Sequence, residues 1–556
     1  MFKSNGINYE NVRPKANLLS SKKINFHDKK DLIKNVKREK SIRFSKKSNL
    51  IFFLLCISFS LFISFNILKV TYKKEINPSA VQAKIKINRG KILDRNNEII
   101  ATSIDTNDLY VDIKKSLDKE KLKNVLSEIF EDKDSAFFER IFNKEQYSLI
   151  KKDISPTELN KLKSLGDPAI KLHESKKRVY PQHNIFSNLI GLKTNELISK
   201  IEKNMNKELV KGKNLKLTVD LRIQNIVREE LYKSLIEYKA KAALAVVMNV
   251  KSGEIFSMVS LPDFNPNYPK SILPKTENNL NAEARYEMGS TLKIFNAAMV
   301  YESESEIQFN EFEISDGYQI TNEKHILDDH INEKILNFDD VFVKSSNIGS
   351  VKIFESFGSN KQKQFFKKVG LTENLNITGL NVVSNKLPIN WESHSKFISY
   401  GYGLSLSPIS LITAFSSLVN GGYKIQPSLI KNRINQKELK VFSSQTSKKI
   451  NELIHKIVMD GTGKKAQVKG LSIGGKTGTS KKVEKGNYSE EKKITSFIGI
   501  FPANSPEFLT FVLFDEPQKN VANSKETTGG NTAAPTFSKI VKKISPIIIK
   551  DNYSRN

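Results

Sequence analysis

A serine precedes a lysine by three residues at the head of an apolar run, "YEMGSTLKIFNAAMV" (residues 286–300). Side chains three residues apart lie on the same face of a helix, so Ser290 and Lys293 would be neighbours. A lysine that is held beside a hydroxyl in a dry cleft can lose its charge and act as a base, which would make the serine a nucleophile. The spacing alone is weak support, because this lysine-rich chain repeats it elsewhere, for example at Ser393/Lys396.

Two further elements follow in chain order, "KSSNIGS" and "IGGKTGTS". They supply Ser345, Asn347, Lys476, Thr477, Gly478 and Thr479. Other copies of these short patterns fall inside an apolar stretch near the N-terminus or precede the nucleophile. Only one set therefore has all three elements in order and well spaced, which favours a catalytic interpretation.

The first two elements match the needs of attack on a peptide carbonyl. Ser290 would attack while neutral Lys293 accepts its proton. Ser345 can pass a proton to the leaving amine, and Asn347 can orient Lys293 and the substrate amide. The sequence therefore predicts a serine acyl-enzyme whose base is a lysine.

The third element suits a substrate that ends in a free carboxylate, which needs a cation and hydroxyls. We expect Lys476, Thr477 and Thr479 to supply them from the edge of a strand. Gly478 would let the substrate backbone come close. Backbone N–H groups of Ser290 and Thr479 are expected to form the oxyanion hole.

With these motifs the sequence resembles the monofunctional class B penicillin-binding proteins, D,D-transpeptidases that cross-link peptidoglycan. Outside the motifs, "RGKILDRNNEIIATS" resembles the signature that opens their pedestal domain, and "LTVDLRIQNIVREEL" resembles the start of their transpeptidase domain. The resemblance implies a Ser290 acyl-enzyme formed from a stem peptide ending in D-Ala-D-Ala, and acylation by β-lactams. It implies no cofactor and no metal.

The expected fold class is α+β, in four parts. We predict a basic cytoplasmic tail over 1–48, a membrane anchor over 49–69, an elongated pedestal of the dimerisation type over 70–212, and a transpeptidase domain over 213–550. Strands occur at both ends of the last part and helical patterns fill its middle. This order predicts an antiparallel sheet, closed by remote chain segments and packed against helices.

The anchor rests on "LIFFLLCISFSLFISFNIL" (Leu50–Leu68), an uncharged run long enough to span a bilayer as a helix. Basic residues before it predict a cytoplasmic N-terminus and a periplasmic catalytic domain at a bacterial inner membrane. The run is too long for the cleaved signal peptide that is the alternative, and no cleavage site follows it. Cys56, the only cysteine, excludes an intramolecular disulfide and would face lipid.

Local signals predict several elements. Asn96-Asn97 marks a turn between two strands, and Lys251-Ser252-Gly253 marks the turn of a hairpin. Ser155 and Asp220 are predicted helix N-caps. The pattern of the charged stretch 113–175 predicts helices.

Other polar groups have simpler interpretations. The net charge of +29 is spread along the chain and no nucleic-acid motif accompanies it, which argues against nucleic-acid binding. The histidines and aspartates of "HILDDHINEK" (325–334) could hold a metal, but we favour a polar loop above the cleft. Lys464 and Lys465 fit a solvated turn. Trp391 could line the cleft or pack in the core.

The overall layout favours the division-type branch of the family, with the elongation type as the alternative. A β-lactam-binding sensor is less consistent with the short tail, and the intact Ser290, Lys293 and Lys476 argue against a scaffold without activity. The segment before the transpeptidase domain is too short for a glycosyltransferase. The expected partners are therefore peptidoglycan stem peptides, a membrane glycan polymerase of the SEDS type and other division proteins.

Overall fold

The computed structural model describes residues 46–73, 88–144, 146–190, 200–268, 276, 278–322, 324–328, 330–431, 439–484, 486–518 and 526–553. The chain divides into two compact units, Met1–Lys86 and Ile87–Asn556. Nearly all of the predicted basic tail lies outside the described residues.

The first unit contains one described helix, α2 (Lys46–Lys73), which covers the stretch predicted as the anchor. Cys56 lies on this helix and is exposed. Among the residues that the structure describes, no helix reaches the length and apolarity required to cross a membrane.

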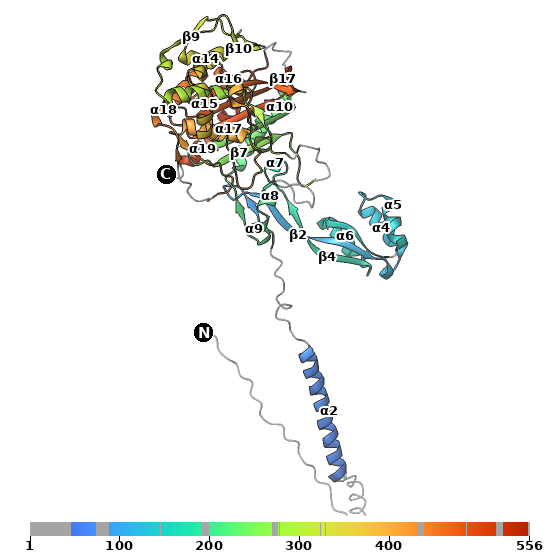
Figure 1. Ribbon diagram of the computed structural model, residues 1–556. Helices are drawn as coiled ribbons and strands as arrows, with labels where there is room; N and C mark the ends of the chain where they lie inside the picture. The colour runs from blue at the N-terminus through green and yellow to red at the C-terminus, as the bar shows by residue number, and fades with distance from the viewer. Residues whose placement is uncertain are drawn as a thin grey trace, which may run out of the picture. The chain divides into compact units, whose positions relative to one another are not determined.

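The N-terminal part of the second unit is a small sheet in the order β3-β2-β1-β5, with β4 paired to β2 (Figure 1). Its strands are β1 (Ile92–Leu93), β2 (Ile99–Asp112), β3 (Tyr147–Ile154), β4 (Ile170–Val179) and β5 (Leu215–Lys216). The 3-10 helix η1 (Ile113–Lys115) and the helices α4 (Lys119–Ile129), α5 (Ser135–Lys144) and α6 (Pro156–Leu165) accompany it. The turn at Asn97 is confirmed, with φ of 73°, and Ser155 caps α6 within a capping box.

The larger sheet has the order β16-β17-β18-β6-β7 and is antiparallel throughout. Its strands are β6 (Ala242–Asn249), β7 (Ile255–Leu261), β16 (Gly474–Glu484), β17 (Asn487–Phe501) and β18 (Phe508–Asp515). Strand β18 pairs with β6, more than 250 residues earlier in the chain, so the predicted closure by remote segments is confirmed. As predicted, Asp220 caps the helix that begins at Leu221. Gly253, with φ of 71°, lies in the predicted hairpin turn between β6 and β7.

Both faces of this sheet are buried. Along β6, Leu244, Val246 and Met248 belong to one core cluster, whereas Ala243 and Val247 belong to another. This alternation follows from the two-residue period of a strand. Helices α10 (Leu221–Glu237) and α19 (Ala533–Tyr553) pack on the second cluster.

The helices of the middle of the chain pack on the first cluster (Figure 1). They include α12 (Lys293–Glu302), α13 (Phe338–Val343), α14 (Asn347–Glu355), α15 (Gly358–Lys368), α16 (Trp391–Tyr400), α17 (Pro408–Val419) and α18 (Ser444–Asp460). Shorter helical elements are α7 (Ser187–Ile190), α8 (Lys200–Asn204), α9 (Asn206–Val210), α11 (Leu280–Glu283), η3 (Gly289–Leu292), η4 (Glu306–Phe309) and η5 (Lys464–Ala466). Short strands are β8 (Tyr286–Glu287), β9 (Glu311–Glu313), β10 (Tyr318–Thr321), β11 (Lys324–Ile326), β12 (Ile335–Asn337), β13 (Ser405–Leu406), β14 (Tyr423–Lys424) and β15 (Leu439–Lys440).

Candidate active site

Ser290 lies on a 3-10 turn that leads directly into a helix. The turn is η3, and the N–H of Lys293, the first residue of α12, donates to the carbonyl of Ser290. In a 3-10 turn the side chains of residues i and i+3 eclipse each other, so Ser290 and Lys293 share a face as predicted, although the α-helix begins only at Lys293. Ser290 is half-buried at a cleft, whereas Lys293 is fully buried.

The Lys293 Nζ is held by the second motif. It donates to the carbonyl of Ser345 at 2.6 Å, to Asn347 Oδ1 at 2.8 Å and to Ser345 Oγ at 3.4 Å. Burial lowers the pKa of Lys293 to about 7, although the nearby Asp328 carboxylate acts in the opposite direction. A large fraction of Lys293 is therefore neutral near pH 7, in the form that can accept a proton.

Ser345 has a left-handed backbone, with φ of 65°, and its side chain is buried. A residue with a Cβ rarely adopts this conformation, which costs roughly 1–2 kcal/mol and persists only where the surroundings enforce it. Ser345 lies between α13 and α14, and this conformation places its Oγ within reach of Lys293. The strained backbone of Ser345 is therefore part of what positions its hydroxyl in the site.

The carboxylate of Asp328 stabilises the strained loop that contains Ser345. Its carboxylate accepts hydrogen bonds from Ser346 Oγ at 2.5 Å and from the N–H groups of Asn347 and Ile348 at 2.9 and 3.1 Å. It thereby satisfies the first N–H groups of α14 and complements the positive end of the helix. Asp328 itself is buried, within a polar loop that reaches the cleft as expected.

The rest of the 325–334 segment divides differently. His330 lines the cleft, and Asp329 lies outside the described residues. No group of three or more His, Cys, Asp or Glu side chains that could hold a metal occurs in the part of the chain that the structure describes.

Lys476 reaches the same serine hydroxyl from the sheet. On β16 its Nζ donates to Ser345 Oγ at 2.9 Å and to the Thr477 carbonyl at 3.2 Å. Burial, and secondly the charge of Lys293, hold the pKa of Lys476 well below its usual value. The three motifs therefore meet at a single hydroxyl group.

The structure corrects the expected arrangement of the third motif. Lys476 is fully buried and does not line the cleft, whereas Thr477 and Thr479 do. The ammonium of Lys476 still reaches the neighbouring threonine, with Nζ 3.5 Å from Thr477 Oγ1. Lys476 therefore contacts Ser345 beneath the surface, whereas the two threonines line the open cleft.

Gly478 has a packing role that the sequence did not predict. A Cβ at this position would lie 2.7 Å from the carbonyl oxygen of Met288 and 3.0 Å from Thr291 Cγ2, and would collide with Ser496 Oγ. The missing side chain thus lets the segment that carries the nucleophile approach β16. The absence of a side chain here makes room for the protein's own chain, and the expected approach of a substrate backbone stays a prediction.

The cleft has a volume of about 880 Å³. Thr477 Oγ1 lies 2.8 Å from Thr462 Oγ1, and Thr479 Oγ1 accepts a hydrogen bond from the N–H of Gly529 at 3.0 Å. Lys464 and Lys465 lie exposed on a short 3-10 turn, as expected, and both also line this cleft. The cleft thus presents hydroxyls and ammonium groups, together with the carboxylates of Glu490 and Glu526, which pair with Lys481 and Lys493.

Sequence reasoning missed Glu287, three residues before the nucleophile. Its carboxylate accepts hydrogen bonds from the N–H of Gly403 at 2.7 Å and the hydroxyl of Tyr488 at 3.1 Å, and its carbonyl accepts one from Ser480 Oγ at 2.6 Å. Burial raises the pKa of Glu287. The residue ties the nucleophile turn to three other segments, and no local sequence signal marks it.

Trp391, whose position the sequence left open, packs in the core. Its Nε1–H donates to Gln362 Oε1 at 3.0 Å, and its ring meets the ring of Phe366 with centroids 5.7 Å apart.

Two known protein families match most of the second unit. Residues 243–542 match the penicillin-binding protein transpeptidase domain, and residues 84–219 match the penicillin-binding protein dimerisation domain. The chain belongs to the penicillin-binding protein transpeptidase family. The three motifs that meet at Ser345 all lie within the first match.

Several relatives of this penicillin-binding protein span most of its length. It is 28% identical over 480 residues to the probable peptidoglycan D,D-transpeptidase FtsI of Caulobacter vibrioides, covering 83% of this chain and 81% of the relative. It is also 28% identical over 553 residues to the peptidoglycan D,D-transpeptidase FtsI of Buchnera aphidicola subsp. Schizaphis graminum, covering 91% and 96%. The stage V sporulation protein D of Bacillus subtilis is likewise 28% identical, over 512 residues that cover 82% and 78%.

The fold is shared with a solved structure. The crystal structure of a peptidoglycan synthetase from Bifidobacterium adolescentis matches with a TM-score of 0.63 at 18% identity, covering 83% of this chain and 96% of that one. The likeness supports the architecture, a mixed α+β transpeptidase domain that follows a pedestal domain.

Proposed function

We propose that this penicillin-binding protein is a peptidoglycan D,D-transpeptidase of the division-type branch. The observation that carries the proposal is the meeting of three remote motifs: Lys293 and Lys476 both donate to the hydroxyl of Ser345, beside the cleft that Ser290 lines. The printed names of the Caulobacter and Buchnera relatives support both the reaction and the branch.

In the first half-reaction Ser290 Oγ bonds to the carbonyl carbon of the penultimate D-Ala. Lys293 accepts the hydroxyl proton, and the amide C–N bond breaks. Ser345 lies between the two amines and passes a proton to the departing D-Ala nitrogen. In the second half-reaction an amine of a neighbouring strand attacks the ester, its proton returns to Ser290, and the cross-link is released.

The third motif recognises the substrate in this proposal. Thr477 and Thr479 bind the terminal carboxylate, with Lys476 behind them, and Asn347 orients Lys293 and the substrate amide. Backbone N–H groups of Ser290 and Thr479 form the oxyanion hole. A Cβ on Gly289 would lie 3.0 Å from the Thr479 nitrogen, so these two backbone segments are close enough to serve one oxygen.

The finer organisation is part of the same proposal. We place domain boundaries after residues 48, 69 and 212, with α2 as a single-pass anchor in the inner membrane and the catalytic domain in the periplasm. The support is the uncharged 19-residue run at Leu50–Leu68 and the basic residues before it. A SEDS-type glycan polymerase and division proteins are the proposed membrane partners.

Fluorescent penicillin labelling of membranes tests the reaction. The wild-type chain should be labelled and Ser290→Ala should not, whereas Ser393→Ala, in an exposed Ser-x-x-Lys copy, should be labelled normally. Persistent labelling of Ser290→Ala would remove Ser290 as the nucleophile. Depletion of the protein tests the branch: filamentous cells would support division, and round cells would support the elongation type.

A further inference from the structure

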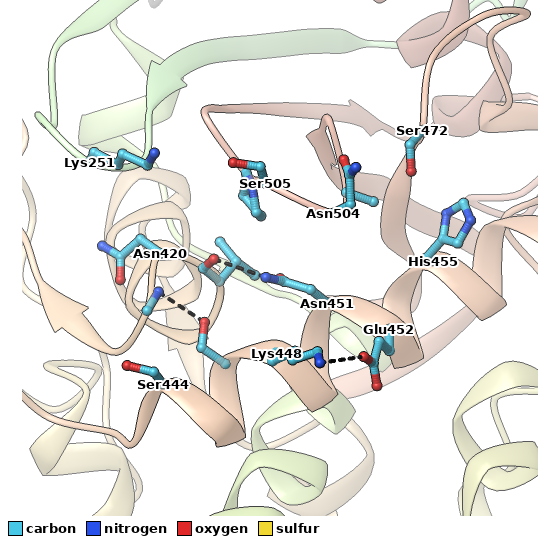
Figure 2. A pocket seen from close by; sticks show the side chains of 15 residues that line it. Lys251, Asn420, Ser444, Lys448, Asn451, Glu452, His455, Ser472, Asn504 and Ser505 are labelled. Carbon is cyan, nitrogen blue, oxygen red and sulfur yellow. Dashed lines mark hydrogen bonds and ion pairs between the residues drawn. The ribbon is translucent and has the colours of Figure 1, made fainter.

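The pocket drawn in Figure 2 is separate from the catalytic cleft. It has a volume of about 430 Å³, and one face of α18, the C-terminal end of α17 and the turns after β6 and β17 form its walls. It shares no lining residue with the cleft. A substrate that reacts with Ser290 therefore does not continue into this pocket and extends along the cleft itself, whose walls include β16 and the corner at the end of α16.

Strand β16 is the outermost strand of the large sheet, and its outer edge faces the nucleophile turn η3. The N–H of Lys481 points to that edge, because it donates to a side chain beyond the sheet, the hydroxyl of Tyr402. Backbone N–H groups two residues apart on a strand point to the same edge, and the register with β17 is regular up to Lys481. The N–H of Thr479 therefore also points outward. A Cβ on Gly289 would lie 3.0 Å from this nitrogen, which agrees with that direction.

The proposed function fixes the direction of a donor peptide along this edge. Its terminal carboxylate lies at Thr477 and Thr479, and its reacting carbonyl lies between the N–H groups of Ser290 and Thr479. The residues that precede the reacting alanine must then run toward Lys481, antiparallel to β16. A peptide that adds to a sheet edge pairs through its main chain at every second residue. The carbonyl two residues before the reacting alanine would therefore face the N–H of Lys481.

Tyr402 occupies the position that this carbonyl would need. Its hydroxyl oxygen accepts the hydrogen bond from the N–H of Lys481 at 3.2 Å, and the residue lines the cleft together with Ser290. A backbone N–H is a single donor, so the bond to Tyr402 leaves the strand edge without a free donor at Lys481. The edge that a donor peptide can pair with therefore ends at Thr479.

Neighbouring groups hold Tyr402 at the strand edge. The N–H of the next residue, Gly403, donates to the carboxylate of Glu287 at 2.7 Å. The ring of Tyr402 packs edge to face against Tyr488 of β17, with centroids 5.2 Å apart, and the hydroxyl of Tyr488 donates to the same carboxylate at 3.1 Å. Because Glu287 lies three residues before Ser290, the segment that carries the nucleophile also fixes the position of Tyr402.

We propose that Tyr402 is a specificity-determining residue that ends the pairing of the donor stem peptide with β16 at Thr479, an inference that rests on the transpeptidase function proposed above. Beyond the amide that Asn347 orients, the main chain of the peptide makes no further hydrogen bond with the strand. The enzyme therefore accepts a donor whose preceding segment lacks a peptide backbone as readily as one that has it. Selection among donors depends on the last two residues and on side chains.

Two thioester probes that differ in one amide test the proposal on the purified full-length chain in detergent. They are the mercaptoacetate thioesters of N-acetylglycyl-D-alanine and N-pentanoyl-D-alanine, which have acyl chains of equal length. Only the first carries a carbonyl two residues before the alanine. Ser290 Oγ bonds to the thioester carbon, its proton passes to Lys293, and the C–S bond breaks to release mercaptoacetate as a thiolate, which a thiol reagent measures.

The wild-type chain should not distinguish the two probes. We expect values of kcat/KM that agree within about twofold, because Tyr402 already occupies the donor that the extra carbonyl would use. A preference of about fivefold or more for the acetylglycyl probe, the value of one net hydrogen bond, would overturn the proposal. Failure of the proposed function would be seen separately, as a wild-type chain that releases thiolate from neither probe and is not labelled by fluorescent penicillin.

Two variants open the strand edge. Tyr402→Ala removes the ring and the hydroxyl, whereas Tyr402→Leu removes the hydroxyl and the outer part of the ring but keeps apolar packing at its base. In each, the acetylglycyl probe should gain about fivefold in kcat/KM relative to the pentanoyl probe, because the N–H of Lys481 becomes available. Tyr232→Ala, at an exposed tyrosine of α10, should keep the wild-type ratio. An unchanged ratio in either Tyr402 variant that fluorescent penicillin still labels would overturn the proposal.

Discussion

The Nζ of Lys476 donates a hydrogen bond to Ser345 Oγ at 2.9 Å, across 131 residues of sequence. The contact joins the central sheet to the helical side of the domain. Lys293 Nζ lies 3.4 Å from the same oxygen, so one hydroxyl lies between two buried amines. A proton can therefore move from the base beside the nucleophile toward the strand, and either amine can restore the hydroxyl.

Lys476→Met should impair acylation much more than folding. Methionine keeps the buried apolar stem but removes the donor to Ser345, and a charge-assisted hydrogen bond is worth roughly 1.5–3 kcal/mol, or about tenfold to 100-fold in rate. Second-order rate constants for acylation by fluorescent penicillin measure the loss. Lys482→Met, on the same strand but in contact with Asp515 and Glu516, is the control and should react normally. Equal rates for the Lys476 variant and the wild type would contradict the proposed role.

The acylation rate should rise with pH and level off above pH 7. Burial lowers the pKa of Lys293 to about 7, and only the neutral amine can accept the Ser290 proton. Below that pKa the lysine is increasingly protonated, so the rate constant should fall about tenfold per pH unit. Stopped-flow or gel-based labelling across this range measures the profile. A rate that does not change through pH 7 would argue against Lys293 as the base.

Asp328→Asn should move the midpoint of that profile to lower pH. The carboxylate of Asp328 favours the charged form of Lys293, so its removal lowers the lysine pKa further. Asparagine retains one acceptor oxygen for the N–H groups that Asp328 now binds. Asp316→Asn, at an exposed residue, serves as the control and should leave the midpoint in place. A midpoint that rises in Asp328→Asn would contradict the assigned electrostatics.

The sequence predicted elements that depend on neighbouring residues well, but it predicted pairing between distant segments poorly. The N-cap at Asp220 and the turn at Gly253 depend on neighbouring residues, so short patterns reveal them. Strand β3 was missed because it lies in a charged stretch, 113–175, and gains its stability from pairing with β2.

The candidate site shows the same difference between what the sequence could predict and what it could not. Chain order alone grouped Ser290, Ser345 and Lys476, and the structure brings these segments together. The support from Asp328 could not be foreseen, because the nearest hydrogen-bond partner of its carboxylate is 18 residues away and its burial is set by packing. The burial of Lys476 could not be predicted from strand alternation, since its Nζ also reaches Thr477 Oγ1 at 3.5 Å.

Substitutions at Ser345 should separate stability from activity. Glycine relieves the left-handed strain of roughly 1–2 kcal/mol but adds backbone entropy to the unfolded state, so Ser345→Gly should be about 0.5–1 kcal/mol more stable than Ser345→Ala. Urea unfolding measures the difference, and both variants should lose acylation because both lack the hydroxyl. At Ser350, within helix α14, the order should reverse and alanine should be the more stable. Greater stability of Ser345→Ala than of Ser345→Gly would show that the strain is absent.

Gly478→Ala should disable the enzyme through the position of the nucleophile. The added methyl would meet the Met288 carbonyl and Thr291 Cγ2, so the turn that carries Ser290 must move away from β16. The shifts that relieve such overpacking typically lower the free energy of unfolding by about 1–3 kcal/mol, a loss that a domain of this size can tolerate. Acylation should fall at least tenfold while the chain stays folded by circular dichroism. Gly470→Ala, where the methyl would meet nothing within 4 Å, introduces backbone strain at φ of 84° and should acylate normally. Normal acylation by Gly478→Ala would mean that the turn tolerates the shift, and that close packing between Gly478 and Met288 does not set the position of Ser290.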